Sequence, residues 1–266
     1  MPDSLIKDLL HLPRVGVRAL AVWKRHLRVW LKGAVWSGVF GDLIEPVIYL
    51  FGLGYGLGAF VSEINGESYI HYVAPGLLAM GVMWSASFEN TYGSFTRMER
   101  QKTFSAIMMT PVSLEEVVAG EVLFGATKSL VGSFMMLIVL GAMGLADFPG
   151  ALWLIPLAML IGLAHAAIAL TVTALSPSYD FFTYYFTVIL TPVLLLSGAW
   201  FPLERMHPVL QQASEVLPLT HAVRAARIIL SGGPGGALLP SLLVLALYAV
   251  LFFTLSANLI RRRLIT

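Results

Sequence analysis

Glycines, histidines and nucleophilic side chains are the groups whose spacing could indicate catalysis. The stretch Gly120–Ser129 resembles a phosphate-binding loop, but two residues separate Gly125 from Lys128. In a true loop the lysine directly follows the second glycine, so that its ammonium group reaches the phosphates. The six histidines form no HExxH pair, no GxSxG motif is present, and the chain has no cysteine. We therefore expect no catalytic site, and no metal or cofactor bound by this chain.

Ionisable residues inside apolar segments are the second candidate group. Such residues are energetically unfavourable in a membrane and usually mark function. Two interpretations remain open: pairing inside the protein, for example of Glu89 or Glu121 with Lys128, or contact with a transported substrate. We favour pairing, and keep these residues as candidates for a substrate path: Asp42, Glu45, Glu89, Tyr92 and Lys128.

The composition indicates an all-α integral membrane protein. Hydrophobic residues make up 58% of the 266 residues, charged residues only 12%, and the mean hydropathy is +0.80. The first 12 residues contain no apolar segment of a cleavable signal peptide. Each span needs about 20 apolar residues. Six segments qualify, at 34–59, 72–95, 117–144, 151–175, 181–200 and 237–260.

An amphipathic helix is predicted before the first span, at 13–32. Its basic residues fall along one line and its tryptophans and leucines along the opposite one, which is typical of a helix lying in the headgroup layer. A solvated face on a soluble bundle is the alternative. The residues that define the predicted interfacial helix are Arg18, Trp23, Arg25, Arg28 and Trp30.

The positions of lysine and arginine predict the orientation. Seven of the 17 lie in residues 1–33, three in 96–116 and three in 261–263, whereas the turns at 61–71 and 145–150 have none. Because cytoplasmic loops carry the excess of positive charge, both termini and the 96–116 loop are predicted to be cytoplasmic.

The cytoplasmic loop at 96–112 and the residues after it contain an ordered helix–turn–helix signal. A short helix is predicted to end near Met109, with a turn at Thr110-Pro111. Ser113 and Glu116 then have the spacing of a capping box, which starts a new helix. A loop with this much order is better suited to binding another protein than to linking two spans.

Residues 201–236 interrupt the pattern of spans. They contain four prolines, the last within a glycine-rich end, and between these lie two apolar-periodic pieces too short to span a membrane. A re-entrant helical hairpin on the outer side, between spans five and six, fits this pattern. A surface loop outside the membrane fits the composition equally well.

Five stretches of the chain resemble the ABC type-2 exporter permeases, and within them the NodJ group of nodulation-factor (lipo-chitooligosaccharide) exporters. The resemblance covers nearly the whole chain from Val22 onward. The stretches that carry it are Glu45–Gly54, Arg97–Glu99 with Gln101–Thr103, Ser176–Asp180, Leu196–Pro202 and Arg261–Leu264.

The resemblance implies a permease in the bacterial inner membrane, a homodimer that pairs with two copies of a separate ATPase, which binds ATP and Mg. A helix at 97–109 would be the coupling helix seated in the ATPase, beside the interfacial helix. The residues expected to dock the ATPase or transmit force are Arg97, Glu99, Arg100, Gln101, Lys102, Thr103, Thr110, Pro111, Ser113 and Glu116.

The expected function is export of an amphiphile, a lipo-oligosaccharide or lipid-linked glycan, with membrane lipids as further partners and no nucleic acid. Export of a drug or another hydrophobic small molecule by the same machinery is an alternative. An intramembrane lipid-modifying enzyme is disfavoured, because no acid–base or nucleophile constellation is present. An ion-coupled carrier is disfavoured, because no internal repeat is evident.

Overall fold

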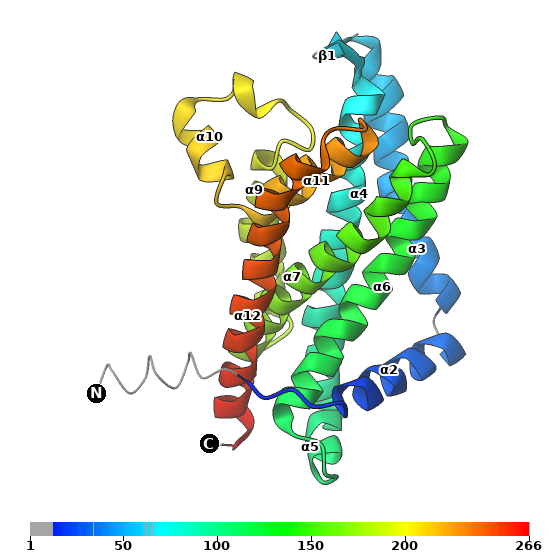
Figure 1. Ribbon diagram of the computed structural model, residues 1–266. Coiled ribbons are helices and arrows are strands. Elements are labelled where there is room, and N and C mark those ends of the chain that lie inside the picture. The colour runs from blue at the N-terminus through cyan, green and yellow to red at the C-terminus, as the bar shows by residue number, and fades with distance from the viewer. Residues whose placement is uncertain (1–12, 34, 62, 65, 266) are drawn as a thin grey trace.

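The computed structural model describes residues 13–33, 35–61, 63–64 and 66–265, and these are mostly helical. Long helices run side by side between two ends (Figure 1). We call the end that carries α2 and α5 the loop end, and the end that carries α10 and α11 the hairpin end. The helices are α2 (Ala19–Gly33), α3 (Val35–Phe51), α4 (Tyr69–Phe88), α5 (Thr103–Met108), α6 (Leu114–Ala142), α7 (Leu154–Leu175), α8 (Asp180–Tyr184), α9 (Thr191–Leu196), α10 (Pro208–Ser214), α11 (Pro218–Leu230) and α12 (Leu239–Ile265).

Short helical segments extend several of these helices. π-Helical turns, which are wider than α-helical ones, continue α3, α4 and α8, and 3₁₀ turns lie at several helix ends. The π-helical segments are η1 (Gly52–Gly56), η3 (Glu89–Gly93), η4 (Thr96–Arg100) and η6 (Tyr185–Leu190). The 3₁₀ segments are η2 (Leu57–Ala59), η5 (Gly150–Trp153), η7 (Leu203–Arg205) and η8 (Gly235–Leu238). Strands β1 (Glu63–Ile64) and β2 (Glu67–Ser68) form a small antiparallel pair before α4, with Glu63 opposite Ser68.

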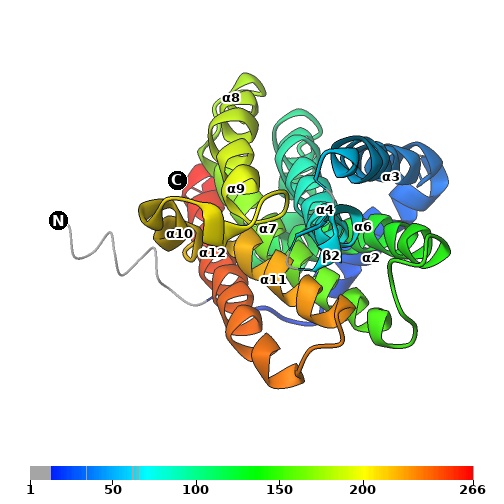
Figure 2. The same cartoon turned by 90° about the horizontal axis from the view of Figure 1, so that it is seen from above.

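Helices α4, α6 and α7 form the centre of the bundle, and α12 packs along α7. Seen from the hairpin end, α3 lies at one side and α8–α9 at another (Figure 2). The alanines and the glycine on the buried face of α7 allow close helix packing. A Cβ on Gly162, for example, would lie 2.6 Å from the hydroxyl oxygen of Ser129 on α6.

The hydropathy of the helices matches a membrane protein. Among the described residues, three helical stretches are long and apolar enough to cross a membrane: Leu114–Ala142, Gly150–Leu175 and Gly235–Ile265. Ile44–Ala59 and Asp180–Leu196 are apolar but shorter. The predicted class, a helical membrane protein, is thereby confirmed. The predicted number of six spans is not, because three of the described stretches meet the criterion of length and hydropathy.

Two helices have limits that differ from the predicted ranges. The helix expected at 13–32 begins only at Ala19. Residues before it cross the start of α6, where a Cβ on Gly16 would lie 2.4 Å from the Glu116 carboxylate, so a side chain at position 16 would require that carboxylate to move. The predicted span at 72–95 lies within a longer helix, which continues through Gly93 and η4 to Arg100.

The two helices of the segment at 201–236 have different surroundings. Helix α11 packs against α4, α7 and α12, and its first residues, Pro218–Val223, are buried. Helix α10 is largely exposed, with Val209 at 64% exposure. The Arg224 guanidinium, hydrogen-bonded to Glu215, holds the pKa of that carboxyl below its usual range. One half of the segment therefore belongs to the bundle and the other lies on its surface.

Candidate coupling site and buried charge network

The segment between α4 and α6 makes a sharp, well-anchored tip at the loop end. After η4 the chain turns at Lys102, whose φ of 51° lies in the left-handed region. Helix α5 follows, held by the buried side chains of Thr103 and Phe104. The predicted single helix at 97–109 is thus two helical pieces, η4 and α5, separated by the left-handed turn.

The capping box that starts α6 is confirmed. The Ser113 hydroxyl accepts from the Glu116 backbone N–H at 3.2 Å, and the Ser113 backbone N–H donates to the Glu116 carboxylate at 2.8 Å. These bonds satisfy two N–H groups that the first turn of a helix leaves open. The tip is therefore joined to α6 by a defined geometry.

The outer surface of the tip is exposed and carries both charge and apolar area. Met109 is 87% exposed, and α5 projects beyond α2 at the loop end (Figure 1). The exposed residues among those predicted to dock a partner are Arg100, Gln101, Lys102, Thr110, Pro111 and Ser113. An apolar centre within a polar rim is typical of protein–protein interfaces.

Arg97, predicted to dock a partner, instead points into the protein. Its side chain is only 14% exposed and forms ion pairs with Glu89 at 2.8 Å and Glu121 at 2.6 Å. Gly93 makes room for these contacts, since a Cβ there would lie 2.4 Å from the Glu89 carboxylate. In this conformation the Arg97 guanidinium is not available for docking.

Five residues from three parts of the chain form what we call the charge network: His26, Glu89, Arg97, Glu121 and Lys128. Lys128 pairs with Glu89 at 3.2 Å, and His26 Nε2 lies 3.0 Å from the Glu121 carboxylate. The network joins α2, the α4–η4 helix and α6. With His26 neutral, its two cations balance its two carboxylates, which offsets much of the desolvation cost of burying them. The favoured interpretation of Glu89 and Lys128 as an internal pair is confirmed.

Helix α2 is attached to α6 through one stripe of side chains. Ala19, Val22, His26 and Trp30 are buried, and Trp30 packs edge-on against Phe124. Gly120 allows this approach, because a Cβ there would lie 2.6 Å from Val22. His26 was not among the residues selected from the sequence. Its spacing of three to four residues from the other members of the stripe was the signal that it is buried.

The predicted interfacial residues divide between the two faces of α2. Trp23 donates to the Thr127 hydroxyl at 2.9 Å, and Trp30 is buried, whereas Arg25 and Arg28 are exposed. Arg18, just before the helix, donates to the backbone carbonyl of Pro111 in the tip. The lateral position of α2 across the loop end (Figure 1) agrees with a helix lying along a membrane surface.

The C-terminal arginines tie α12 to the same region. Arg263 donates to the carbonyls of Thr173, Ala174 and Ser176 at the end of α7, and pairs with Glu99 at 3.1 Å. Arg261 pairs with Glu115. A cation that caps the last carbonyls of a helix is favourable. In the sequence these arginines indicated the orientation and formed part of the resemblance. No local pattern indicated their contacts, because Glu99 is 164 residues from Arg263.

The remaining substrate-path candidates do not gather at one place. Glu45 lines a cavity of about 330 Å³ between α3 and α4, together with Trp84 and Phe88. Tyr92 lies in a stack of aromatic rings with Tyr179, 6.2 Å away. The side chain of Asp42 lies outside the described residues.

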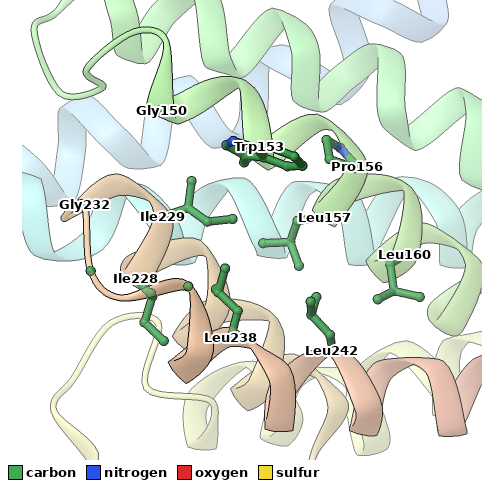
Figure 3. A pocket seen from close by; sticks show the side chains of 12 residues that line it. Gly150, Trp153, Pro156, Leu157, Leu160, Ile228, Ile229, Gly232, Leu238 and Leu242 are labelled. Atoms are coloured by element: carbon green, nitrogen blue, oxygen red, sulfur yellow. The ribbon is translucent and has the colours of Figure 1, made fainter.

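A further cavity has a mostly apolar lining. It measures about 640 Å³ and lies between α7, α11 and α12 at the hairpin end (Figure 3). Trp153, Leu157 and Leu160 face Leu238 and Leu242 across it, and no titratable side chain lines it. Among the described residues, no three histidines or acids are grouped to hold a metal ion. The phosphate-loop look-alike lies inside α6, where Gly120 and Gly125 serve close packing.

The structure is that of a helical membrane protein with an exposed, well-anchored tip at one end. The family model of the ABC-2 type transporter matches residues 18–231, and the chain belongs to this family. It is a transport subunit and not an enzyme, and members of the family work with an ABC ATPase.

Known proteins with similar sequences indicate which members of the family this chain resembles. Nodulation protein J of Sinorhizobium fredii is 40% identical over 93% of this chain and 94% of the relative. Nodulation protein J of Rhizobium leguminosarum bv. trifolii is 41% identical over 96% of this chain and 97% of the relative. The inner membrane transport permease YadH of Escherichia coli is 25% identical over 96% of this chain. The chain is thus an ABC-2 permease similar to the nodulation proteins J.

Proposed function

We propose that this chain is the membrane subunit of an ATP-driven exporter of an amphiphile, and that work enters through the α5 tip. The observation that carries the proposal is the exposed tip surface around Met109, held rigidly by buried Phe104 and by the capping box at Ser113. The partner ATPase binds ATP and Mg and supplies the motion.

Two connections lead from the tip into the bundle. The capping box joins it to α6, and η4 carries Arg97 into the charge network, which also holds α2. Arg18 and the C-terminal arginines add contacts to the tip and its flanks. A displacement of α5 therefore acts on α2, α4, α6 and α12 together.

The assembly proposed here has two copies of this chain and two of the ATPase in the bacterial inner membrane. The six predicted spans place both termini and the tip in the cytoplasm, with the hairpin end outside. In this arrangement residues 201–236 form the outer hairpin, of which α11 is the part packed within the bundle.

The substrate class proposed is a lipo-oligosaccharide or a lipid-linked glycan. Support comes from the names of the relatives and from the cavity beside Glu45, which combines a carboxylate and a serine with aromatic rings. The test is transport by the reconstituted permease–ATPase complex of a fluorescent lipo-oligosaccharide and, separately, of a hydrophobic dye. ATP-dependent transport of the dye alone would contradict the glycan assignment.

The coupling assignment is tested by reversing charge on the tip. We expect Arg100→Glu with Lys102→Glu to weaken binding of the ATPase by at least about tenfold, as for loss of about 1.4 kcal/mol at an interface. Glu99 is left unchanged because it pairs with Arg263. Co-purification and ATP hydrolysis of the complex are the measurements. Arg205→Glu, an exposed arginine at the hairpin end, is the matched control. Equal binding by the tip variant and the control would remove the coupling role.

A further inference from the structure

A second cavity at the hairpin end is lined by polar groups that the transport proposal does not use. It measures about 380 Å³ and lies between the start of α4 and the end of α11. Its polar lining consists of Glu67, Ser68, His71, Arg227 and Ser231, and the rest is apolar. Arg227 is the one permanent cation in this lining.

Arg227 is held in place by groups that leave its charge unneutralised. Its Nη2 donates to the carbonyls of Tyr72 at 3.3 Å and Gly198 at 3.1 Å, and the guanidinium lies 4.1 Å from the centre of the Tyr72 ring. Its buried Nε has no hydrogen-bond acceptor, and no carboxylate of the described residues forms an ion pair with it. A buried N–H without an acceptor is unfavourable.

The cavity holds a second nitrogen suited to the same ligand. His71 Nδ1 lies 2.7 Å from the Ser68 hydroxyl. When Ser68 donates this hydrogen bond, the imidazole proton is on Nε2, which is then a donor. A planar guanidinium with an imidazole N–H beside it is the donor set that binds phosphate oxygens.

Glu67 opposes anion binding and sets a limit on it. It is exposed, on β2, and forms no ion pair with Arg227. Its carboxylate therefore lowers the affinity of the cavity for an anion, but it does not occupy the position beside Arg227 where an anion would bind. Removing its charge is expected to tighten binding, the opposite of removing the charge of Arg227.

We propose that this cavity binds a phosphate-type oxyanion through Arg227, and that the anion is the headgroup of a membrane lipid. The last turn of α11 separates this polar cavity from the apolar one of Figure 3: Ile228 and Ile229 line the apolar side, and Arg227 and Ser231 the polar side. Polar and apolar cavities on two sides of one turn match the two ends of an amphiphile. The site is independent of the coupling tip and of the exported substrate.

The test measures lipid retained by the full chain in phosphatidylcholine nanodiscs that contain a minor fraction of phosphatidylglycerol. Native mass spectrometry counts the lipids bound after release. Wild type is expected to retain phosphatidylglycerol over phosphatidylcholine, Arg227→Gln to retain about tenfold less, and Glu67→Gln to retain more. Arg205→Gln, at the same end but outside the cavity, is the matched control and should equal wild type. Inorganic phosphate is added as a competitor. It displaces the lipid if the site prefers free phosphate, and it leaves the lipid bound if the site is specific for the lipid headgroup.

Equal retention of the two lipids by wild type, or equal retention by wild type and Arg227→Gln, would overturn the proposal. Because Arg227 also holds two backbone carbonyls, Arg227→Gln could fail to fold. Ser231→Leu then decides the question, since it narrows the cavity and leaves the bonds of Arg227 in place. A folded Ser231→Leu variant that retains phosphatidylglycerol as wild type does would equally overturn the site.

Discussion

At the scale of single residues, the pairs of the charge network distinguish this protein from a bundle held by apolar contacts alone. Glu121 is fully buried and serves Arg97, His26 and the Ser94 hydroxyl, which donates to it at 2.7 Å. Removing one partner of a buried pair leaves the others charged and unpaired. Through Glu121 the network therefore links α2 and the α4–η4 helix to α6.

Glu121→Gln is expected to lower the free energy of unfolding by about 3–5 kcal/mol, because Arg97 loses its closest counter-charge inside the protein. Thermal unfolding of the purified protein in detergent measures the change. The control is Glu215→Gln, which breaks the exposed pair with Arg224 and should change stability by less than about 1 kcal/mol. Similar losses in both variants would show that burial of the network contributes nothing.

The partners in the network explain why local sequence patterns could not reveal it. Arg97 and Glu121 are 24 residues apart, and Lys128 and Glu89 are 39 apart. Outside the network, Arg263 and Glu99 are 164 apart. The sequence offered Glu89 or Glu121 as the buried partner of Lys128, because each is costly to bury alone, and the structure has Glu89. The resemblance assigned Arg97 to docking, whereas its two carboxylate partners hold it inside the protein.

At the scale of elements, the limits of a helix could be predicted where the residues that determine them are close in sequence. The capping box at Ser113 and Glu116 acts over one turn, and the start of α6 followed from it. The start of α2 could not be predicted in the same way, because Gly16 and Glu116 are 100 residues apart in the sequence and come together only in the folded protein. The continuation of α4 through η4 was missed for the same reason, since its charges are neutralised by distant residues.

The contact between α2 and α6 gives a prediction at this scale. Gly120→Val places a branched side chain where Val22 packs, and overpacking of this kind typically costs about 1–3 kcal/mol. We expect a lower unfolding temperature and a more exposed Trp23, seen as a red shift of tryptophan fluorescence. Gly33→Ala, where a Cβ meets no atom within 4 Å, is the matched control and should leave both unchanged. An unchanged Gly120→Val variant would contradict the packing of α2 on α6.

At the scale of the whole molecule, the two ends of the bundle differ in chemistry. The loop end holds the charge network, the exposed tip and the basic residues of α2, whereas the hairpin end holds an apolar and a polar cavity around α11. This asymmetry agrees with the distribution of lysine and arginine that predicted the orientation. A molecule with such ends is suited to receive force at one and to handle amphiphiles at the other.

The absence of cysteine makes the orientation directly testable. In intact spheroplasts, a membrane-impermeant maleimide is expected to label Gln212→Cys on exposed α10 and not Ala106→Cys on exposed α5. After lysis both variants should react, which controls for the reactivity of each thiol. Labelling of Ala106→Cys in intact spheroplasts would reverse the proposed topology.

The π-helical turns η3 and η4 have a mechanical consequence. They lie in the stretch of helix that connects α5 to α4, and Arg97 is in η4 while its partner Glu89 is in η3. A widened turn carries one surplus residue per bulge, and bulges of this kind are frequent at functional sites. If a bulge moves along this helix, the residues that it passes shift by about one residue along the axis and rotate about it, while the overall length of the helix stays the same. A displacement of the tip would then reach the charge network as a rotation of the helix that carries Arg97.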